Sequence, residues 1–428
     1  MNWILAIPLA WRLAIVSLAG ACLGALANWA IAALAFEPRS TSPWAARPDG
    51  LRRRWFDRVP VLGWFAMRRE ASLHGSGFWL RPLAIEVLFA AGAAALYWWE
   101  VDQGGLLPKR ILPMQPLLRP LVDVHVQWLC HVVLFWLMLV VSVIDADEKL
   151  IPDAITVPGT IFGLIAAAVC PFALLPVLWT DGQGFVTPGF LHLTSPHGWP
   201  SGLAGSPHVG SLALALACWW LWCVALMHRT WYDRHGWRRA LGLMLARVAR
   251  EPSTWRLVWL GLAGSAGILA TWLWTSTSWM GLLSALVGLA AGGGLIWAVR
   301  IIGYAVLRRE AMGFGDVTLM AMIGSFLGWQ SCLLIFFLAP IAGLVIGVIQ
   351  VVFRRGSEIP YGPFLCLAAA VVMIRWQAFW EWMEMVLAVL GPLVPIFMVA
   401  CLAAMALVLA VWRVLRAAVR RVLRGIFR

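Results

Sequence analysis

The chain has 428 residues, of which 62% are hydrophobic and only 12% are charged, and its formal net charge is +13. This composition, with a mean hydropathy of +0.83, excludes a large soluble globule and indicates an integral membrane protein. The positive charge does not indicate a partner nucleic acid, because the basic residues concentrate in short loops between apolar spans, as membrane topology requires.

Apolar runs and polar breaks predict about ten spans in an all-α, polytopic transmembrane helical bundle. They lie at 6–35, 83–99, 126–144, 155–178, 209–227, 257–275, 280–306, 317–353, 361–376 and 385–412. The first has no small-residue cleavage site before its polar break, so we expect a retained span and no signal peptide. Gly324 and Gly328 interrupt 317–353, and Pro340 adds a kink, so that segment is either one bent helix or two short ones.

The charges of the loops predict the orientation of the chain. Residues 36–81 contain nine arginines and are expected in the cytoplasm, whereas 179–208 contain no lysine or arginine and are expected outside. Residues 228–256 and the C-terminal tail are basic again, which places the N-terminus outside. The loop at 100–125 is a mild exception, since it carries three basic residues on the predicted outer face. The aromatic residues among the arginines of 36–81 favour packing on the membrane surface.

Two acidic runs directly adjoin apolar stretches, and both fall at the predicted cytoplasmic boundary. Residues 142–153 read SVIDADEKLIPD, and Asp316 ends the run Met-Gly-Phe-Gly-Asp. Carboxylates are costly at a membrane, and Gly313 and Gly315 allow backbone or substrate to approach closely. Two carboxylates in one site cannot both ionise cheaply, so one keeps a proton while the other acts as a base on water. We therefore expect a water-activating pair. The plainer interpretation is that these acids only terminate and cap helices.

The remaining polar residues of this region have structural interpretations. Asp147 and Asp153 are weaker candidates than a catalytic pair, and Asp153 is expected to cap a helix that starts near Ala154. Lys149 is expected to extend to the interface or to pair with a neighbouring acid. The histidines show no metal spacing, and His74, His192, His197 and His208 are expected to be solvated. The eight cysteines form no C-x-x-C pair, so we expect buried small hydrophobes and no metal site.

Five ordered motifs resemble those of type IV prepilin peptidases, which are membrane aspartic proteases of the GxGD type. SVIDADEKLIPD and AMGFGDVTLMAMIGSFLGW resemble the two active-site segments; GALAN at 24–28, residues 57–64 with 82–86, and EIPYGPF at 358–364 resemble three others. The resemblance covers about two-thirds of the chain in the correct order. It implies that Asp145 and Asp316 are the catalytic pair, flanked by Gly313 and Gly315. It also implies that Glu86 orients a cytoplasmic loop.

The resemblance implies an enzyme of the inner membrane that cleaves short basic leaders from prepilin or pseudopilin precursors at the cytoplasmic face. Many members carry two C-x-x-C pairs, which resemble a zinc-binding unit, and also methylate the product. Residues 36–81 contain no cysteine, so no metal or other cofactor is expected. S-adenosylmethionine is expected only if methyl transfer is retained. The partners expected are the precursors and the lipid bilayer, and the oligomeric state is left open.

The two candidate aspartates are 171 positions apart, and about 100 inserted residues with two spans account for the excess over the family's usual spacing. An even number of inserted spans leaves both aspartates on the same membrane face. The predicted units are a first span (1–35), a basic and aromatic cytoplasmic segment (36–81), two core parts (82–178 and 280–376) separated by the insertion (179–279), and an extra span with a basic tail (377–428).

Two alternatives remain open at this point. One is a non-catalytic membrane scaffold or transporter derived from such a peptidase, although a transporter usually has its acids in broken helices near the midplane, not at span ends. The other is a presenilin-like intramembrane protease, which shares the GxGD chemistry. The short loop of the first acidic run and the late PYGPF run favour the prepilin type.

Overall fold

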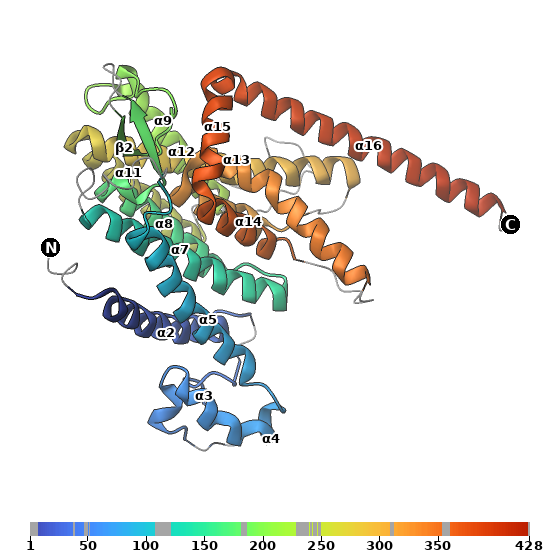
Figure 1. The fold of residues 1–428 in the computed structure, drawn as a ribbon. Helices are drawn as coiled ribbons and strands as arrows, with labels where there is room; N and C mark the ends of the chain where they lie inside the picture. Colours follow the sequence, from blue (N-terminus) through green and yellow to red (C-terminus); the bar gives the residue numbers. More distant parts are fainter. Residues whose placement is uncertain are drawn as a thin grey trace.

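The structure is a computed structural model, and it describes residues 7–36, 39–46, 50, 52–107, 121–180, 186–227, 239, 242, 246, 250–308, 312–352 and 360–426. These residues form a bundle of α-helices with one short two-stranded sheet (Figure 1). Among them, seven helices are long and apolar enough to cross a membrane, and a bent helix pair makes an eighth candidate. The predicted all-α, polytopic membrane fold is confirmed.

Each predicted span has a helical counterpart in the structure. The helices are α2 (Leu9–Ala33), α5 (Leu80–Tyr97), α7 (Leu121–Glu148), α8 (Asp153–Val169), α9 (Val209–Ala225), α11 (Pro252–Trp274), α12 (Ser276–Leu307), α13 (Phe314–Val352), α14 (Gly362–Ile374), α15 (Trp376–Leu390) and α16 (Val394–Ile426). Two of them, α8 and α9, have 17 residues and fall short of a full span, and α14 and α15 form the pair bent by 87°. The predicted span 155–178 is therefore too long, because the helix ends at Val169 and a strand begins at Pro176.

Helix α13 is two helical legs joined by a turn at Gly328, where φ is +79° and glycine alone is unstrained. Cys332, in the second leg, packs beside Gly324 of the first leg and beside Gly288 of α12. The turn therefore folds the second leg back, and the question left open for 317–353 is answered by two short helices. Both ends of α13 then lie toward the same end of the bundle, which carries the chain back to the residues before α14.

The segment between α8 and α9 packs onto this turn. It contains the antiparallel strands β1 (Pro176–Thr180) and β2 (Val186–Phe190). Beyond β2, the carbonyl oxygens of His192 and Leu193 accept hydrogen bonds of 2.8 Å from the side chains of Gln330 and Trp329, respectively, which directly follow the turn. This loop thus braces the helix that begins with the GFGD run.

The first helices form a separate pair at the edge of the bundle. Helices α2 and α5 pack along each other, and the short elements η1 (Trp55–Arg58), α3 (Leu62–Met67), η2 (Arg68–Glu70) and α4 (Ala71–His74) lie beyond their ends (Figure 1). Trp64 and Met67 are buried within this unit. Trp64 is therefore not one of the surface anchors predicted for 36–81, whereas Trp55 is exposed as expected.

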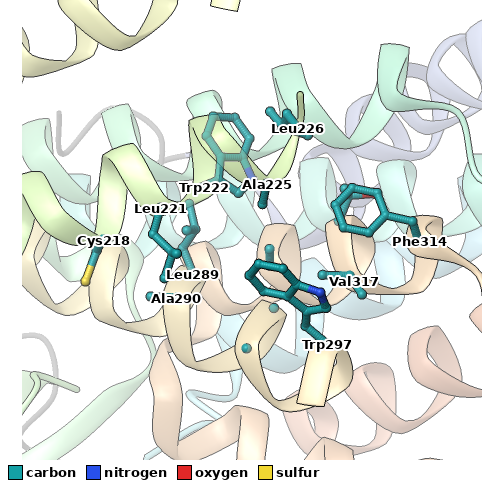
Figure 2. Close-up of a pocket in the computed structure, with 14 residues that line it drawn as sticks. Cys218, Leu221, Trp222, Ala225, Leu226, Leu289, Ala290, Trp297, Phe314 and Val317 are labelled. Carbon is teal, nitrogen blue, oxygen red and sulfur yellow. The ribbon is translucent and has the colours of Figure 1, made fainter. Parts of the chain in front are cut away.

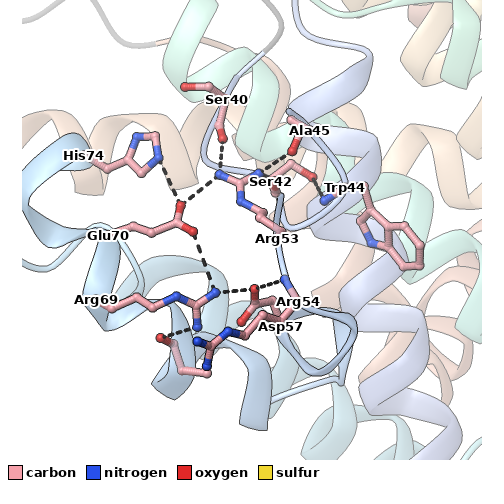
Figure 3. Close-up of polar contacts among 11 residues, drawn as sticks. Ser40, Ser42, Trp44, Ala45, Arg53, Arg54, Asp57, Arg69, Glu70 and His74 are labelled. Carbon is pink, nitrogen blue, oxygen red and sulfur yellow. Dashed lines mark hydrogen bonds and ion pairs between the residues drawn. The ribbon is translucent and has the colours of Figure 1, made fainter. Parts of the chain in front are cut away.

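A buried network of ion pairs holds the segment between α2 and α5 together (Figure 3). The carboxylate of Glu70 is 3.1 Å from the guanidinium of Arg53 and 3.5 Å from the ring of His74, and Arg69 pairs with Asp57. The side chains of Glu70 and Asp57 are fully buried, and that of Arg53 is 2% exposed. Arg53 also donates hydrogen bonds to the carbonyl oxygens of Ser40, Ser42 and Ala45, so one guanidinium ties the loop after α2 to the short helices.

Candidate active site

Asp145 and Asp316 line the same cavity, which has a volume of about 360 Å³. Asp145 lies in the last turn of α7 and Asp316 in the first turn of α13, and both are almost fully buried, at 5% and 6% exposure. The two carboxylates are close enough to interact electrostatically. The two acidic runs singled out in the sequence therefore meet in space.

Local backbone geometry brings the ends of these helices together. Lys149 adopts a left-handed conformation (φ +55°), and its N–H donates to the carbonyl oxygen of Asp145, which ends α7 within four residues of the aspartate. In the other run, the backbone of Gly313 hydrogen-bonds the carboxylate of Asp316. The hydroxyl of Thr318, two residues after Asp316 in α13, donates a hydrogen bond to the carbonyl oxygen of Gly315. Each aspartate is thus held by the chain directly around it.

The two glycines of the GFGD run have different surroundings. A Cβ on Gly315 would lie 2.6 Å from Cβ of Ile151, which lies in the first acidic run, after the end of α7. A Cβ on Gly313 would meet nothing nearer than the Asp316 carboxylate at 3.6 Å. Gly315 is therefore the residue that lets α13 begin directly against the loop after α7.

A third element, the residues before α14, completes the cavity. The backbone N–H of Gly362 donates a 3.0 Å hydrogen bond to Oδ2 of Asp145. Pro360 and Tyr361 line the cavity beside the aspartates. The PYGPF run was recognised in the sequence as a family motif, but its contact with Asp145 was not predicted. Nothing in a single sequence links two positions so far apart.

Tyr361 presents a protonated phenol to this cavity. Burial raises the pKa of Tyr361 to about 12, and the negative charge of Asp316 acts in the same direction. At neutral pH the hydroxyl therefore keeps its proton and remains a hydrogen-bond donor next to the carboxylates.

The other acids of the first run have structural contacts. The carboxylate of Asp147 lies 2.7 Å from Arg39 and 2.9 Å from Arg81, which connects the end of α7 to the residues after α2 and to the start of α5. Asp153 is the first residue of α8, one position inside the cap that was predicted for it, and Pro152 occupies the cap. Lys149, in contrast, lines the cavity with the two aspartates.

Glu86, in the second turn of α5, is a buried anchor for the segment between α2 and α5. Its Oε1 accepts hydrogen bonds from the indole N–H of Trp64 at 2.7 Å and from Asn28 of α2 at 2.9 Å, and its Oε2 accepts one from the backbone N–H of Val61. Val61 has a φ of +63°, which is strained for a β-branched residue. Glu86 thus fixes the start of α3 against both membrane helices.

A metal-ligating cluster does not occur among the described residues, where no three side chains of His, Cys, Asp or Glu gather to hold an ion. Among the described residues that line the candidate site, Asp145 and Asp316 are the only acids. Residues 36–81, which include the ion-pair network, contain no cysteine.

These features define a polytopic helical membrane protein with a buried pair of carboxylates at one end of its bundle. Residues 132–196 and 251–348 match the model of the Type IV leader peptidase family. The gap between the two matches, residues 197–250, falls inside the region that the sequence predicts to be inserted. Over the matched residues the chain is similar to the type IV leader peptidases, and the predicted resemblance is confirmed.

Several curated relatives carry the name prepilin leader peptidase/N-methyltransferase. The Pseudomonas aeruginosa protein is 34% identical over 122 residues, which are 28% of this chain and 39% of that protein. The Xanthomonas campestris pv. campestris protein is 33% identical over 129 residues (29% and 42%), and the Legionella pneumophila protein is 28% identical over 135 residues (31% and 44%). The chain thus spans about two-fifths of the length of these relatives. No solved structure matches it.

Proposed function

We propose that this protein is an aspartic endopeptidase that removes the short basic leader from prepilin or pseudopilin precursors. The observation that carries the proposal is the burial of Asp145 and Asp316 in one cavity, within the stretches that match the leader peptidases. The names of the curated relatives supply the substrate class.

In the proposed reaction, one carboxylate removes a proton from a water molecule, and the resulting hydroxide attacks the scissile carbonyl carbon. The other carboxyl group, which enters the reaction protonated, gives its proton to the departing amine as the C–N bond breaks. The N–H of Gly362 holds the Asp145 carboxylate in place, so the attacking water meets an oriented base. Tyr361 closes the cavity on the side of Asp316 and offers its hydroxyl as a donor.

We also propose that the site faces the cytoplasm of a bacterium whose inner membrane holds the protein, with the N-terminus outside. Basic residues support this orientation, because Arg39, Arg81 and Lys149 lie at the same end of α7 as the aspartates, and positive residues concentrate on the cytoplasmic side. Precursor leaders would then meet the site before export.

The proposed cleavage consumes only water and requires no metal or organic cofactor. Two carboxylates supply both the base and the acid, so no Lewis acid is needed in the mechanism. S-adenosylmethionine would serve only a methyl transfer, which is not part of this proposal.

Carboxamide substitutions of the two aspartates test the proposal. Asp145→Asn and Asp316→Asn should each reduce cleavage of a purified prepilin by at least about 1,000-fold, because each removes half of the acid–base pair. Asp102→Asn is the matched control, since Asp102 lies at the other end of α5 and should retain full activity. Cleavage is followed by the mobility shift of the precursor on gels, with the amount of membrane-inserted protein measured in parallel.

The outcome separates the proposed peptidase from the non-catalytic alternatives. Undiminished cleavage by either Asn variant would exclude the two-aspartate mechanism. A wild-type protein that inserts normally but cleaves no prepilin would favour a scaffold or transporter.

A further inference from the structure

A second, apolar pocket lies beside the aspartate cavity, between α9, α12 and α13 (Figure 2). Its walls include Trp222 and Ala225 from α9, Gly294 and Trp297 from α12, and Phe314 and Val317 from α13. None of the described residues that line it is charged, and its volume is about 40 Å³. A cavity of that size has room for a few carbon atoms but not for a helix.

The pocket and the candidate active site share one lining side chain. Phe314 lines both the apolar pocket and the cavity that contains the aspartates, and it lies two residues before Asp316. A peptide bound across the aspartates would therefore pass along the ring of Phe314. In an extended peptide, side chains on the same side recur about every 6.6 Å, so the side chain that enters the pocket would lie within a few residues of the cleaved bond.

The insertion supplies one wall of this pocket. Helix α9 falls within residues 179–279, and its indole and aliphatic side chains cover the face of α12 and α13 next to the GFGD run. The cavity of the aspartates, in contrast, is built from residues outside the insertion. The two aspartates therefore come from outside residues 179–279, whereas the α9 wall of the apolar pocket comes from inside this region.

We propose that the apolar pocket is a substrate subsite, which receives one apolar side chain of the precursor near the cleaved bond. The proposal rests on the peptidase function and adds that the inserted helix α9 selects the substrate. A hydrophobic pocket discriminates by size, because one missing methylene changes the specificity ratio about 10- to 200-fold.

Filling the pocket is a direct test. Gly294 lines the pocket, and a Cβ there would meet no atom within 4 Å, so Gly294→Leu adds an apolar side chain to the pocket wall without displacing the backbone. The neighbouring Gly292 is unsuitable, since a Cβ there would lie 2.6 Å from the carbonyl oxygen of Met320. Gly267→Leu is the matched control, because Gly267 on α11 also has open space around it and does not line the pocket.

The substrates for this test are prepilins in which each of the four residues on either side of the cleaved bond is, in turn, leucine or alanine. The wild-type protein in vesicles should prefer leucine at one position by at least about tenfold in kcat/KM. Gly294→Leu should reduce that preference to less than about threefold by lowering kcat/KM for the leucine substrate alone. Gly267→Leu should keep the wild-type preference.

Three results would overturn the subsite. The first is an unchanged preference of Gly294→Leu for the leucine precursor. The second is a loss of kcat/KM in Gly294→Leu that is equal for every precursor. The third is a change in kcat/KM caused by Gly294→Leu that depends on the acyl-chain length of the vesicle lipids and not on the precursor residue. That result would assign the pocket to a lipid chain. Failure of the proposed peptidase function can be told apart from failure of the subsite. In that case the wild-type protein would cleave none of the precursors, or the Asp145→Asn variant would still cleave them.

Discussion

The backbone N–H of Gly362 donates a hydrogen bond of 3.0 Å to Oδ2 of Asp145, across 217 positions of sequence. This contact joins the start of α14 to the end of α7, and it places the PYGPF run in the candidate site. The run therefore orients a carboxylate of the candidate site, and a hydrogen bond from an N–H group to a carboxylate is among the stronger ones.

We predict that Gly362→Ala disables the site while the protein still folds. A Cβ at this position would lie 2.5 Å from Oδ2 of Asp145, so the carboxylate must move out of its hydrogen bond. The kcat/KM for prepilin cleavage should fall by about 100-fold or more, since a displacement of about 1 Å has that effect in catalytic sites. Cleavage kinetics and size-exclusion profiles in detergent measure the two properties.

Gly347→Ala is the matched control for this substitution. Gly347 lies in the second leg of α13, and a Cβ there would meet nothing within 4 Å. It should leave cleavage unchanged. Near-normal cleavage by Gly362→Ala would show that the Gly362–Asp145 contact has no role in the reaction.

The two glycines of the GFGD run should respond differently to alanine. Gly315→Ala forces a Cβ to within 2.6 Å of Cβ of Ile151, which pushes α13 away from the loop after α7 and separates the aspartates. Gly313→Ala adds a Cβ at ordinary van der Waals distance from its neighbours. We expect a loss of cleavage of about 100-fold or more for Gly315→Ala and less than about fivefold for Gly313→Ala.

The measurement is kcat/KM on one prepilin, with thermal unfolding in detergent to compare the folded states. Equal effects of the two substitutions would contradict the close packing of Gly315 against Ile151.

The sequence alone predicted the membrane class and the meeting of two acidic runs, because both depend on local patterns. Apolar runs of about 20 residues report spans directly, and the flanking residues of Asp145 and Asp316 form recognisable motifs. The turn at Gly328 was left open between two forms, since glycine permits either a bend or a reversal.

The contacts that the sequence did not predict are set by tertiary packing. Single-sequence patterns gave Glu70 and Arg53 no assigned role in an arginine-rich segment, yet they are buried and paired because the loop after α2 folds over them. His192 was expected in solvent and is 4% exposed, because Trp179 and Trp199 pack against its ring. The predicted span 155–178, which contains α8, was too long because its apolar run continues into a buried loop.

The buried ion-pair network predicts that the segment between α2 and α5 keeps its fold without a metal. Glu70→Gln removes a fully buried charge and leaves the guanidinium of Arg53 without its carboxylate, which costs about 3 to 5 kcal/mol when a buried pair is broken. Limited proteolysis should therefore cut residues 52–79 faster in this variant. A chelator should leave the wild-type pattern unchanged.

Glu381→Gln provides the control, because Glu381 is exposed on α15 and its neighbour Gln377 hydrogen-bonds it at the surface. It should show the wild-type proteolysis pattern. Protection of 52–79 that is lost in a chelator and restored by zinc would contradict a metal-free segment, and so would an unchanged pattern in Glu70→Gln.

His192 predicts a pH dependence of the loop that braces α13. Burial lowers the pKa of His192 to about 4, against 6.5 for the exposed side chain. Between these two values the unfolded loop binds a proton and the folded loop does not, so the folded loop is stable above pH 6.5 and loses stability as pH falls toward 4. The shift of roughly 2.5 units corresponds to about 3 kcal/mol at full loss.

Unfolding of wild-type protein and His192→Gln in detergent, followed by tryptophan fluorescence at pH 7, 6, 5 and 4.5, measures this effect. Glutamine does not titrate, so the stability difference between the two proteins should shift in favour of the variant as pH falls through this range. His197→Gln is the control, because His197 is exposed and its substitution should keep the wild-type pH profile. If His192→Gln and wild-type protein lost stability in parallel, the neutral, buried state of His192 would not contribute to the packing of the loop on Gln330 and the turn of α13.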